Sequence, residues 1–292
     1  MRPLRSPEEV ARCCTLGLLL ELATTPKPGL VDRTSKTELY PHFTSSATAL
    51  YRHFRNAAAG RSVGDVVLEA CEEMVSVQSG GNTHLGAVLH LTPLAKAAGL
   101  CSSFRHLRRK AVEVLWRMDH VETLKLFRAI RSVNPSHLGR VAYLDVHQDR
   151  TYRLIEERRL GILQAFKPYE KFEAVAAEYC TGYRNSFVHG YAYLKNQLKH
   201  LDINTAGVNT FLNILSHLPD SHVSRMFGRA AARALSRMAG DVLSRGGWQT
   251  AGGRAAFERL AEKVGRAGFK PAATADILAV SYTLLLLSGW RP

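Results

Sequence analysis

The sequence predicts an all-α protein built as a single domain over residues 1–292. Apolar residues recur at helical spacing along nearly the whole chain. Sustained alternation with a period of two is hard to find, and residues 141–146 are the best short candidate for a strand. Proline, glycine and capping residues divide the helical pattern into segments joined by short linkers. Short linkers favour one domain over two.

The N-terminal elements are marked by their caps. Ser6 is a helix N-cap, Pro7 fits the first helical position and Glu9 completes a capping box, so a helix should run to about residue 23. Two prolines then stop it. A second helix is expected over residues 44–59, closed by a C-terminal glycine.

The next helix begins at Ser62 and ends at the glycine pair 80–81. Asn82 is a good N-cap for a helix to about residue 98, which Pro93 should kink or shorten. A basic helix follows a serine pair, and another runs from about residue 119 to 132. Further helices are expected over residues 151–166, 169–181, 184–200, 204–218, 221–245, 253–267 and 273–288.

Composition limits the class of protein. The hydrophobic fraction of 46% and the charged fraction of 22% are ordinary, whereas a formal charge of +14 favours polyanionic partners such as nucleic acid or a phosphate-rich ligand. The five cysteines have no C-x-x-C spacing and are expected to be reduced. The apolar run at 277–290 is too short to span a bilayer. We expect a cytoplasmic protein without a membrane partner, and the oligomeric state is not indicated.

The loop from Thr24 to Arg33 concentrates residues that bind anions. Prolines on both sides of Lys27 stiffen the backbone, and a rigidly presented lysine loses less entropy when it binds a phosphate. Asp32 could hold Mg²⁺ or act as a base, and Arg33 could bind a phosphate with two parallel hydrogen bonds. The alternative is a surface loop with a local pair between the aspartate and a cation.

A second loop, from residue 79 to 86, has the same character. Gly81 allows close approach of a ligand to the backbone, Asn82 and Thr83 add donors at a helix start, and His84 could move a proton. The segment is not a P-loop, because no G-K-[ST] follows. The alternative is an ordinary capped helix start.

Two later segments place carboxylates at helix starts. Asp220 is followed five residues later by Arg225, and residues 270–276 lead from Lys-Pro through small residues to Asp276. Taken alone, Asp220 is typical of an N-cap, and Asp276 is typical of an acid that compensates the helix dipole.

Together these motifs resemble the triphosphoribosyl-dephospho-CoA synthase family. The order is P-K-P-G-L-V-D-R, G-x-N-T-H-x-G, D-[ST]-x-V-x-R-x-x-G and P-x-x-x-A-D-[IL]-L-A, here at residues 26–33, 80–86, 220–228 and 271–279. The loop at 134–139, N-P-S-H-L-G, is similar to the N-P-G-G-L-G of the archaeal-type branch, which occurs with tetrahydromethanopterin-linked one-carbon metabolism.

The resemblance implies an all-α enzyme that joins the triphosphoribosyl part of ATP to the ribose 2′-hydroxyl of dephospho-CoA and releases adenine. By matched position, the residues implied in nucleotide and phosphate binding are Lys27, Arg33, Gly81, Asn82, Thr83 and Arg225. The implied catalytic residues are His84, Asp32, Asp220 and Asp276, with Asp32 and Asp220 also as ligands of Mg²⁺. We expect these distant corners of the chain to surround a shared polyphosphate pocket.

Two departures from the family and two alternatives remain open. The usual H-x-D-M stretch reads K-T-E-L at residues 36–39, and the late motif has lost its glycines. Either change could redirect or abolish activity. One alternative is a related enzyme of tetrahydromethanopterin-linked cofactor biosynthesis with a different acceptor. The other is a basic helical nucleic-acid-binding protein, which would explain the charge but not the motifs, and no nucleic-acid-binding signature is found.

Overall fold

The computed structural model describes residues 5–133, 138 and 141–292, and every regular element among them is helical. The all-α prediction is confirmed. The α-helices are α1 (Pro7–Ala23), α2 (Tyr40–Ala49), α3 (Tyr51–Ala58), α4 (Val63–Ser76), α5 (Leu85–Leu100), α6 (Phe104–Arg117), α7 (His120–Val133), α8 (Asp149–Glu157), α9 (Ile162–Phe166), α10 (Ala174–Thr181), α11 (Tyr193–Gln197), α12 (Ile203–His217), α13 (Ser221–Phe227), α14 (Arg229–Ser244), α15 (Ala251–Ala267) and α16 (Ala272–Leu287). A 3-10 turn, η1 (Lys167–Tyr169), and a π-helix, η2 (Ser186–Ala192), complete the set.

The described residues pack as two compact units. Unit 1 comprises residues 5–16, 42–183 and 286–292, and unit 2 comprises residues 17–41 and 184–285, within the described ranges. The first and last long helices, α1 and α16, contribute to both units. The prediction of a single domain over 1–292 stays a prediction.

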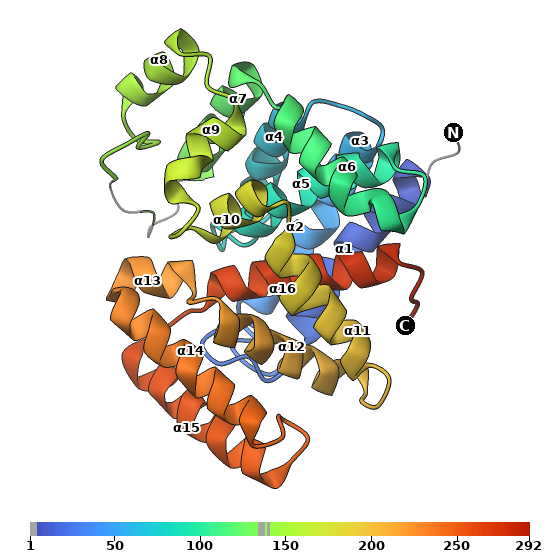
Figure 1. Ribbon diagram of the computed structural model, residues 1–292, viewed down its shortest axis with the longest axis vertical. Coiled ribbons are helices and arrows are strands. Elements are labelled where there is room, and N and C mark those ends of the chain that lie inside the picture. Colours follow the sequence, from blue (N-terminus) through green and yellow to red (C-terminus); the bar gives the residue numbers. More distant parts are fainter. Residues whose placement is uncertain (1–4, 134–137, 139–140) are drawn as a thin grey trace. The chain divides into compact units, whose positions relative to one another are not determined.

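Unit 1 is organised around α5, which is coloured cyan in Figure 1. Helices α3, α4 and α6 pack against α5, and α4 pairs with α7. Nearly every side chain of α5 from Leu85 to Ala98 is buried. A helix that is apolar on all sides belongs in the interior, and the burial of α5 fits that rule.

Pro93 does not shorten α5, which contradicts one of the two effects expected of it; the other, a kink, stays a prediction. The helix continues to Leu100. A proline has no N–H, so the carbonyl of Leu89, four residues earlier, has no helical donor. The hydroxyl of Tyr179 on α10 donates to that carbonyl at 2.6 Å, and the hydroxyl of Tyr183 donates to the carbonyl of His90 at 2.6 Å. The Tyr179 hydroxyl thus satisfies a backbone acceptor that would otherwise be costly to bury.

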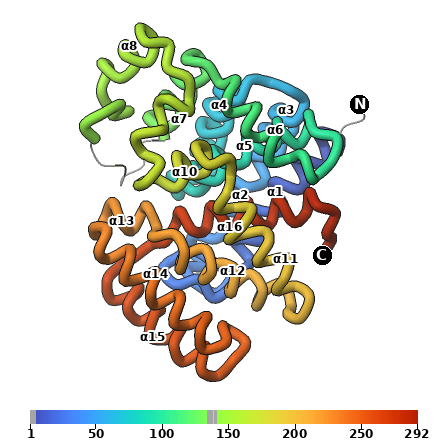
Figure 2. The backbone as a smooth tube through the Cα atoms, viewed as in Figure 1, coloured from blue at the N-terminus to red at the C-terminus, as the bar shows by residue number. Residues whose placement is uncertain are grey.

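Unit 2 consists mainly of stacked C-terminal helices. α12 packs on α14, and α13 and α15 pack on α14 in turn. Figure 2 shows α14 and α15, in orange, running side by side. The residues of α12 from Ala206 to Leu215 are all buried, which makes this helix the core of the unit.

Several helix boundaries differ from the sequence prediction. The segment 221–245 is two helices, because Gly228 adopts a φ of 87° that no helix tolerates. The segment 151–166 is divided after α8, where Arg159 has a left-handed φ of 50°. The segment 44–59 is divided into α2 and α3, and the segment 184–200 into η2 and α11. The segment 169–181 forms only α10 after η1.

Residues 141–146, the best short candidate for a strand, do not form one and instead make bends and a turn. Leu144 has a φ of 48°, and the Asp145 carboxylate accepts the N–H of His147 at 2.9 Å, which folds the chain back on itself. The 134–139 loop lies outside the described residues except for Leu138. None of the helices among the described residues has the length and apolar character needed to cross a membrane.

Candidate active site

Asp32 organises the first motif loop in unit 2. Its fully buried carboxylate accepts the N–H and hydroxyl of Thr34 at 2.8 and 2.9 Å and the N–H of Ser35 at 2.8 Å. The other oxygen accepts the N–H of Lys27 at 3.0 Å. An ionised carboxylate that takes four donors fixes the loop in a single conformation.

Lys27 is buried rather than presented to solvent, with only 1% of its surface exposed. Its ammonium forms an ion pair with Glu21, in the last turns of α1, and also donates to the Glu21 backbone carbonyl. Burial raises the pKa of the Glu21 carboxyl, although the neighbouring Lys27 charge opposes the rise. The alternative that the sequence left open was a surface loop with a local pair between Asp32 and a cation. The structure differs from it, because Lys27 is buried and its ion-pair partner is Glu21 of α1.

The same loop is held to α12 and to the loop before α16. Asn204 at the start of α12 contacts both the N–H and the carbonyl of Thr25, at 2.9 and 2.6 Å. Gly29 has a φ of 81°, and a side chain there would meet the Phe269 carbonyl oxygen at 2.2 Å. Only glycine fits both constraints, so the first motif lies directly against the residue before Lys270.

Three exposed cations lie in or next to the two segments that make this contact. Arg33 is exposed and has no hydrogen-bond or ion-pair partner among the described residues. The Lys36 ammonium donates to the Gly29 carbonyl at 2.5 Å, and desolvation and the nearby charge of Lys270 lower the pKa of Lys36. Lys270 itself is exposed. The K-T-E-L departure thus adds a cation to this surface.

Asp220 joins the third motif to the fourth. One carboxylate oxygen accepts the N–H of Val223 at 3.0 Å, so Asp220 is an N-cap of α13. The other accepts both the N–H and the hydroxyl of Thr274 in α16, each at 2.8 Å. Burial raises the pKa of Asp220, while these donors and the charge of Arg225 partly oppose the rise.

Two residues that the resemblance implied in the site, Asp276 and Arg225, are accessible to solvent. Asp276 is half-buried in the first turns of α16, two residues after Thr274, and Arg225 is exposed on α13. Three of the four motifs therefore meet within unit 2, through the contact between Gly29 and Phe269 and through the contact between Asp220 and Thr274.

The remaining motif, the loop at 80–86, lies in unit 1. Gly81 has a φ of 74° and open space around it, which is the permissive backbone that the sequence predicted. The N-cap of α5 is His84, not Asn82 as the sequence predicted, but the Asn82 side chain still accepts the N–H of Leu85, the first residue of the helix, at 3.1 Å. The Thr83 hydroxyl lies 2.7 Å from that of Ser46 on α2.

His84 is buried, with 4% of its surface exposed. Its backbone N–H points to the sulfur of Met74 at 3.3 Å, its ring packs edge-on against Phe43, and its Nε2 is 3.0 Å from the Phe43 carbonyl. A carbonyl can only accept, so Nε2 carries a proton and the lone pair of a neutral ring is on Nδ1. The ring is oriented by its surroundings, as a general base must be.

Sequence reasoning missed the partners that hold these residues. Glu21 is an acid inside an apolar helix, and such a residue signals a buried ion pair. Thr274 gave no comparable signal, because a small polar residue in a helix start has many roles. Lys36 was noted only as part of a departure from the family pattern.

Mg²⁺ does not fit the two carboxylates that the resemblance implied as its ligands. The oxygens of Asp32 are already taken by backbone and hydroxyl donors of its own loop, and those of Asp220 by the N–H of Val223 and by the N–H and hydroxyl of Thr274 in α16. Within the part of the chain that the structure describes, no group of three or more metal-ligating side chains occurs. We therefore derive no step through a metal held by these residues.

Comparison with known proteins decides the family. The model of the ATP:dephospho-CoA triphosphoribosyl transferase family (CitG) matches residues 7–292. This chain belongs to that family. The family resemblance seen in the motifs is confirmed, and the chain is a transferase by membership.

Individual relatives agree with this assignment. A protein of Pseudomonas paraeruginosa, named "Probable 2-(5''-triphosphoribosyl)-3'-dephosphocoenzyme-A synthase", is 28% identical over 94% of this chain and 90% of its own length. A Pseudomonas aeruginosa protein of the same name has the same identity and coverage. A crystal structure from Archaeoglobus fulgidus, named for the same activity, has a TM-score of 0.66 and 27% identity, and covers 84% of this chain and 99% of that one.

Proposed function

We propose that this chain transfers the triphosphoribosyl group of ATP to the ribose 2′-hydroxyl of dephospho-CoA and releases adenine. The bond from the ribose C1′ to adenine breaks, the bond from C1′ to the acceptor oxygen forms, and the hydroxyl proton leaves toward a base and returns on adenine. The observation that carries the proposal is that three family motifs lie together in unit 2. Asp220 of the third motif accepts two hydrogen bonds from Thr274 of the fourth, and Gly29 of the first packs against Phe269, two residues before the fourth.

The exposed cations of the first loop and of the segment that contacts it are the best candidates to bind the triphosphate. Arg33 offers a planar fork for two phosphate oxygens, and Lys36 and Lys270, which lie close enough for the charge of one to affect the pKa of the other, add two further cations. The charge of Arg225 is close enough to Asp220 to affect its pKa, so this arginine belongs to the same electrostatic environment. Lys27, which the sequence assigned to a phosphate, would have to exchange Glu21 for the ligand, and we give it a positioning role.

The carboxylates divide into two kinds. Asp32 and Asp220 are saturated with donors, so we propose that they fix the loop conformations. Asp276 is half-buried at the motif surface, and we propose that it stabilises the positive charge that develops at C1′ as adenine leaves. A carboxylate placed near an oxocarbenium-like centre lowers the barrier by charge stabilisation.

In the loop of unit 1, we propose that His84 takes the proton of the attacking hydroxyl. Its ring is held by Phe43 with the lone pair on Nδ1. Gly81, Asn82 and Thr83 would supply backbone and side-chain donors to a phosphate at the start of α5. The cytoplasmic location predicted from the sequence is retained as part of this proposal.

The test is to incubate the pure protein with ATP and Mg²⁺, with and without dephospho-CoA, and to measure free adenine by chromatography. We expect adenine only when dephospho-CoA is present. Replacing His84 with Ala should slow adenine release at least about a hundredfold, since general-base catalysis typically contributes that much. A wild-type rate in His84→Ala would remove this residue from the mechanism.

Two other outcomes have clear meanings. Adenine release without consumption of dephospho-CoA would favour a different acceptor, as in tetrahydromethanopterin-linked cofactor biosynthesis. If no adenine forms under any condition, the proposed transfer is wrong for this chain.

A further inference from the structure

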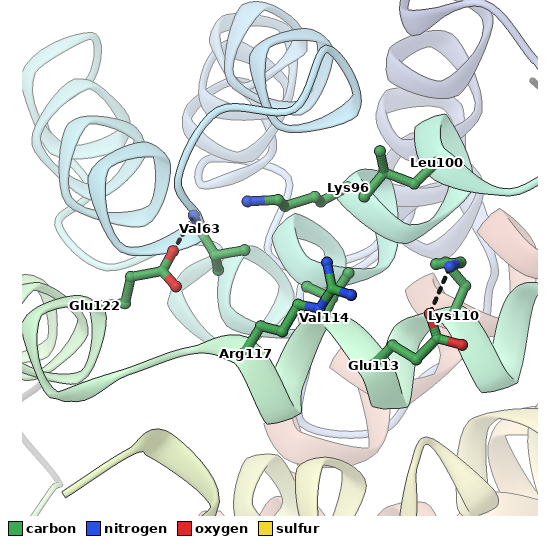
Figure 3. Close-up of a pocket in the computed structure, with 8 residues that line it drawn as sticks. All are labelled: Val63, Lys96, Leu100, Lys110, Glu113, Val114, Arg117 and Glu122. Atoms are coloured by element: carbon green, nitrogen blue, oxygen red, sulfur yellow. Dashed lines mark hydrogen bonds and ion pairs between the residues drawn. The ribbon is translucent and has the colours of Figure 1, made fainter.

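Unit 1 contains a cavity of about 190 Å³ that none of the family motifs uses (Figure 3). It lies where the start of α4, the end of α5, the length of α6 and the start of α7 come together. The residues that line it are Val63, Lys96, Leu100, Lys110, Glu113, Val114, Arg117 and Glu122.

The acidic residues of the cavity already have partners. Glu122 accepts the hydroxyl of Ser62 at 2.9 Å and the backbone N–H groups of Val63 and Gly64 at 2.7 and 3.3 Å. It thereby caps the start of α4 from another helix. Glu113 forms an ion pair with Lys110 at 2.5 Å. Neither carboxylate makes an ion pair with Lys96 or Arg117, the other two cations of the lining.

Those cations are Lys96 on α5 and Arg117 on α6. Neither has a hydrogen-bond or ion-pair partner within the described ranges of the chain. Figure 3 shows both side chains extending into the same space. Two positive charges directed at one cavity repel each other, and an anion between them would convert that repulsion into attraction.

The cavity is distinct from the motif loop of the same unit. Lys96 follows Leu85, the first residue of α5, by 11 positions, which corresponds to about 16 Å along the helix axis. The glycine loop lies at the opposite end of α5 from the cavity. An anion bound here would not share residues with the loop that carries His84.

We propose that this cavity binds a phosphate-sized oxyanion, either free or as the terminal group of a small metabolite. Arg117 supplies a planar guanidinium that can donate two parallel hydrogen bonds, and Lys96 supplies a point charge from the opposite wall. Leu100 and Val114 provide an apolar lining that accommodates a short carbon chain. The site goes beyond the proposed transferase activity, since it involves none of that activity's residues.

Binding can be measured by isothermal titration calorimetry of the whole protein with orthophosphate, pyrophosphate and glycerol 3-phosphate at constant ionic strength. We expect saturable binding that Lys96→Gln and Arg117→Gln each weaken by about tenfold, the effect of losing one charge-assisted contact. Arg105→Gln is the matched control, because Arg105 is an exposed arginine of the same helix outside the cavity, and it should change nothing. If only orthophosphate binds, the ligand of the cavity is the free ion. If glycerol 3-phosphate binds more tightly than orthophosphate, the ligand is a phosphorylated metabolite.

A further variant, expected to bind more tightly, distinguishes the loss of a ligand contact from a loss of binding caused by misfolding. Glu113→Gln removes a carboxylate from the cavity wall and frees Lys110, so it should tighten binding severalfold. Absence of saturable binding in the wild type would overturn the proposal, as would equal affinity in Lys96→Gln and the control. Adenine release measured without added phosphate should be unchanged in Lys96→Gln, so failure of the cavity and failure of the transferase activity are separable.

Discussion

At the scale of single residues, substitutions of Lys27 distinguish a structural role of this side chain from a role in binding a phosphate. Its ammonium is fully buried against Glu21, so Lys27→Met leaves a buried carboxylate without its partner. We expect a loss of about 3 kcal/mol in the free energy of unfolding, measured with urea. The double variant Lys27→Met, Glu21→Gln should recover most of that stability, because no charge is then left buried.

The activity of the double variant is informative. If Lys27 only positions the loop, adenine release should recover with stability. If stability returns while the KM for ATP stays at least about tenfold raised, Lys27 binds a phosphate as the motif resemblance implied, and the positioning role that we assign is wrong.

His90 gives a prediction about pH. Burial lowers its pKa to about 4, and its backbone hydrogen bonds only partly oppose this shift. The unfolded chain takes up the proton near pH 6.5, so the folded state binds fewer protons between those values. Above pH 6.5 the titration of His90 does not reduce the free energy of unfolding. As the pH falls from 6.5 toward 4, it reduces that free energy progressively, by at most about 3 kcal/mol. Urea midpoints at pH 7.5 and 5.0 measure it, and His90→Gln should flatten the difference.

At the scale of helices, the passage of α5 through Pro93 depends on a neighbouring element. Tyr179→Phe removes the donor to the Leu89 carbonyl and should destabilise the protein by about 1–3 kcal/mol, the cost of an unsatisfied buried acceptor. Pro93→Ala restores a helical N–H four residues after Leu89. The tyrosine substitution should therefore cost much less in a Pro93→Ala background, and an equal cost in both backgrounds would refute this explanation.

Helix existence could be predicted from the sequence, but several boundaries could not. Caps and apolar spacing placed both ends of α7 within a residue and the start of α4 at its N-cap, Ser62, whereas α4 ends at Ser76, before the glycine pair that was expected to end it. The division after Phe227 was missed because a glycine inside a helical pattern is often tolerated, and only the observed φ of 87° shows that Gly228 ends the helix. That α5 continues past Pro93 could not be predicted, because the hydrogen-bond donor that compensates for the proline comes from a tyrosine 86 positions later.

At the scale of the whole molecule, the motifs could be found from sequence order, but their connections could not. The contact of Gly29 with Phe269 and that of Asp220 with Thr274 join segments far apart in the chain, and no local pattern specifies such pairs. The sequence predicted one pocket shared by all four motifs. The structure brings three of them together in unit 2 and places the fourth in unit 1, so the shared pocket stays a prediction.

The central claim is that this chain moves a triphosphoribosyl group from ATP to dephospho-CoA. Mass spectrometry of the acceptor, after incubation with ATP, tests it most directly when adenine is quantified in the same sample. We predict one adenine released for each dephospho-CoA that gains the mass of a triphosphoribosyl group. An acceptor of unchanged mass, with or without adenine, would contradict the account.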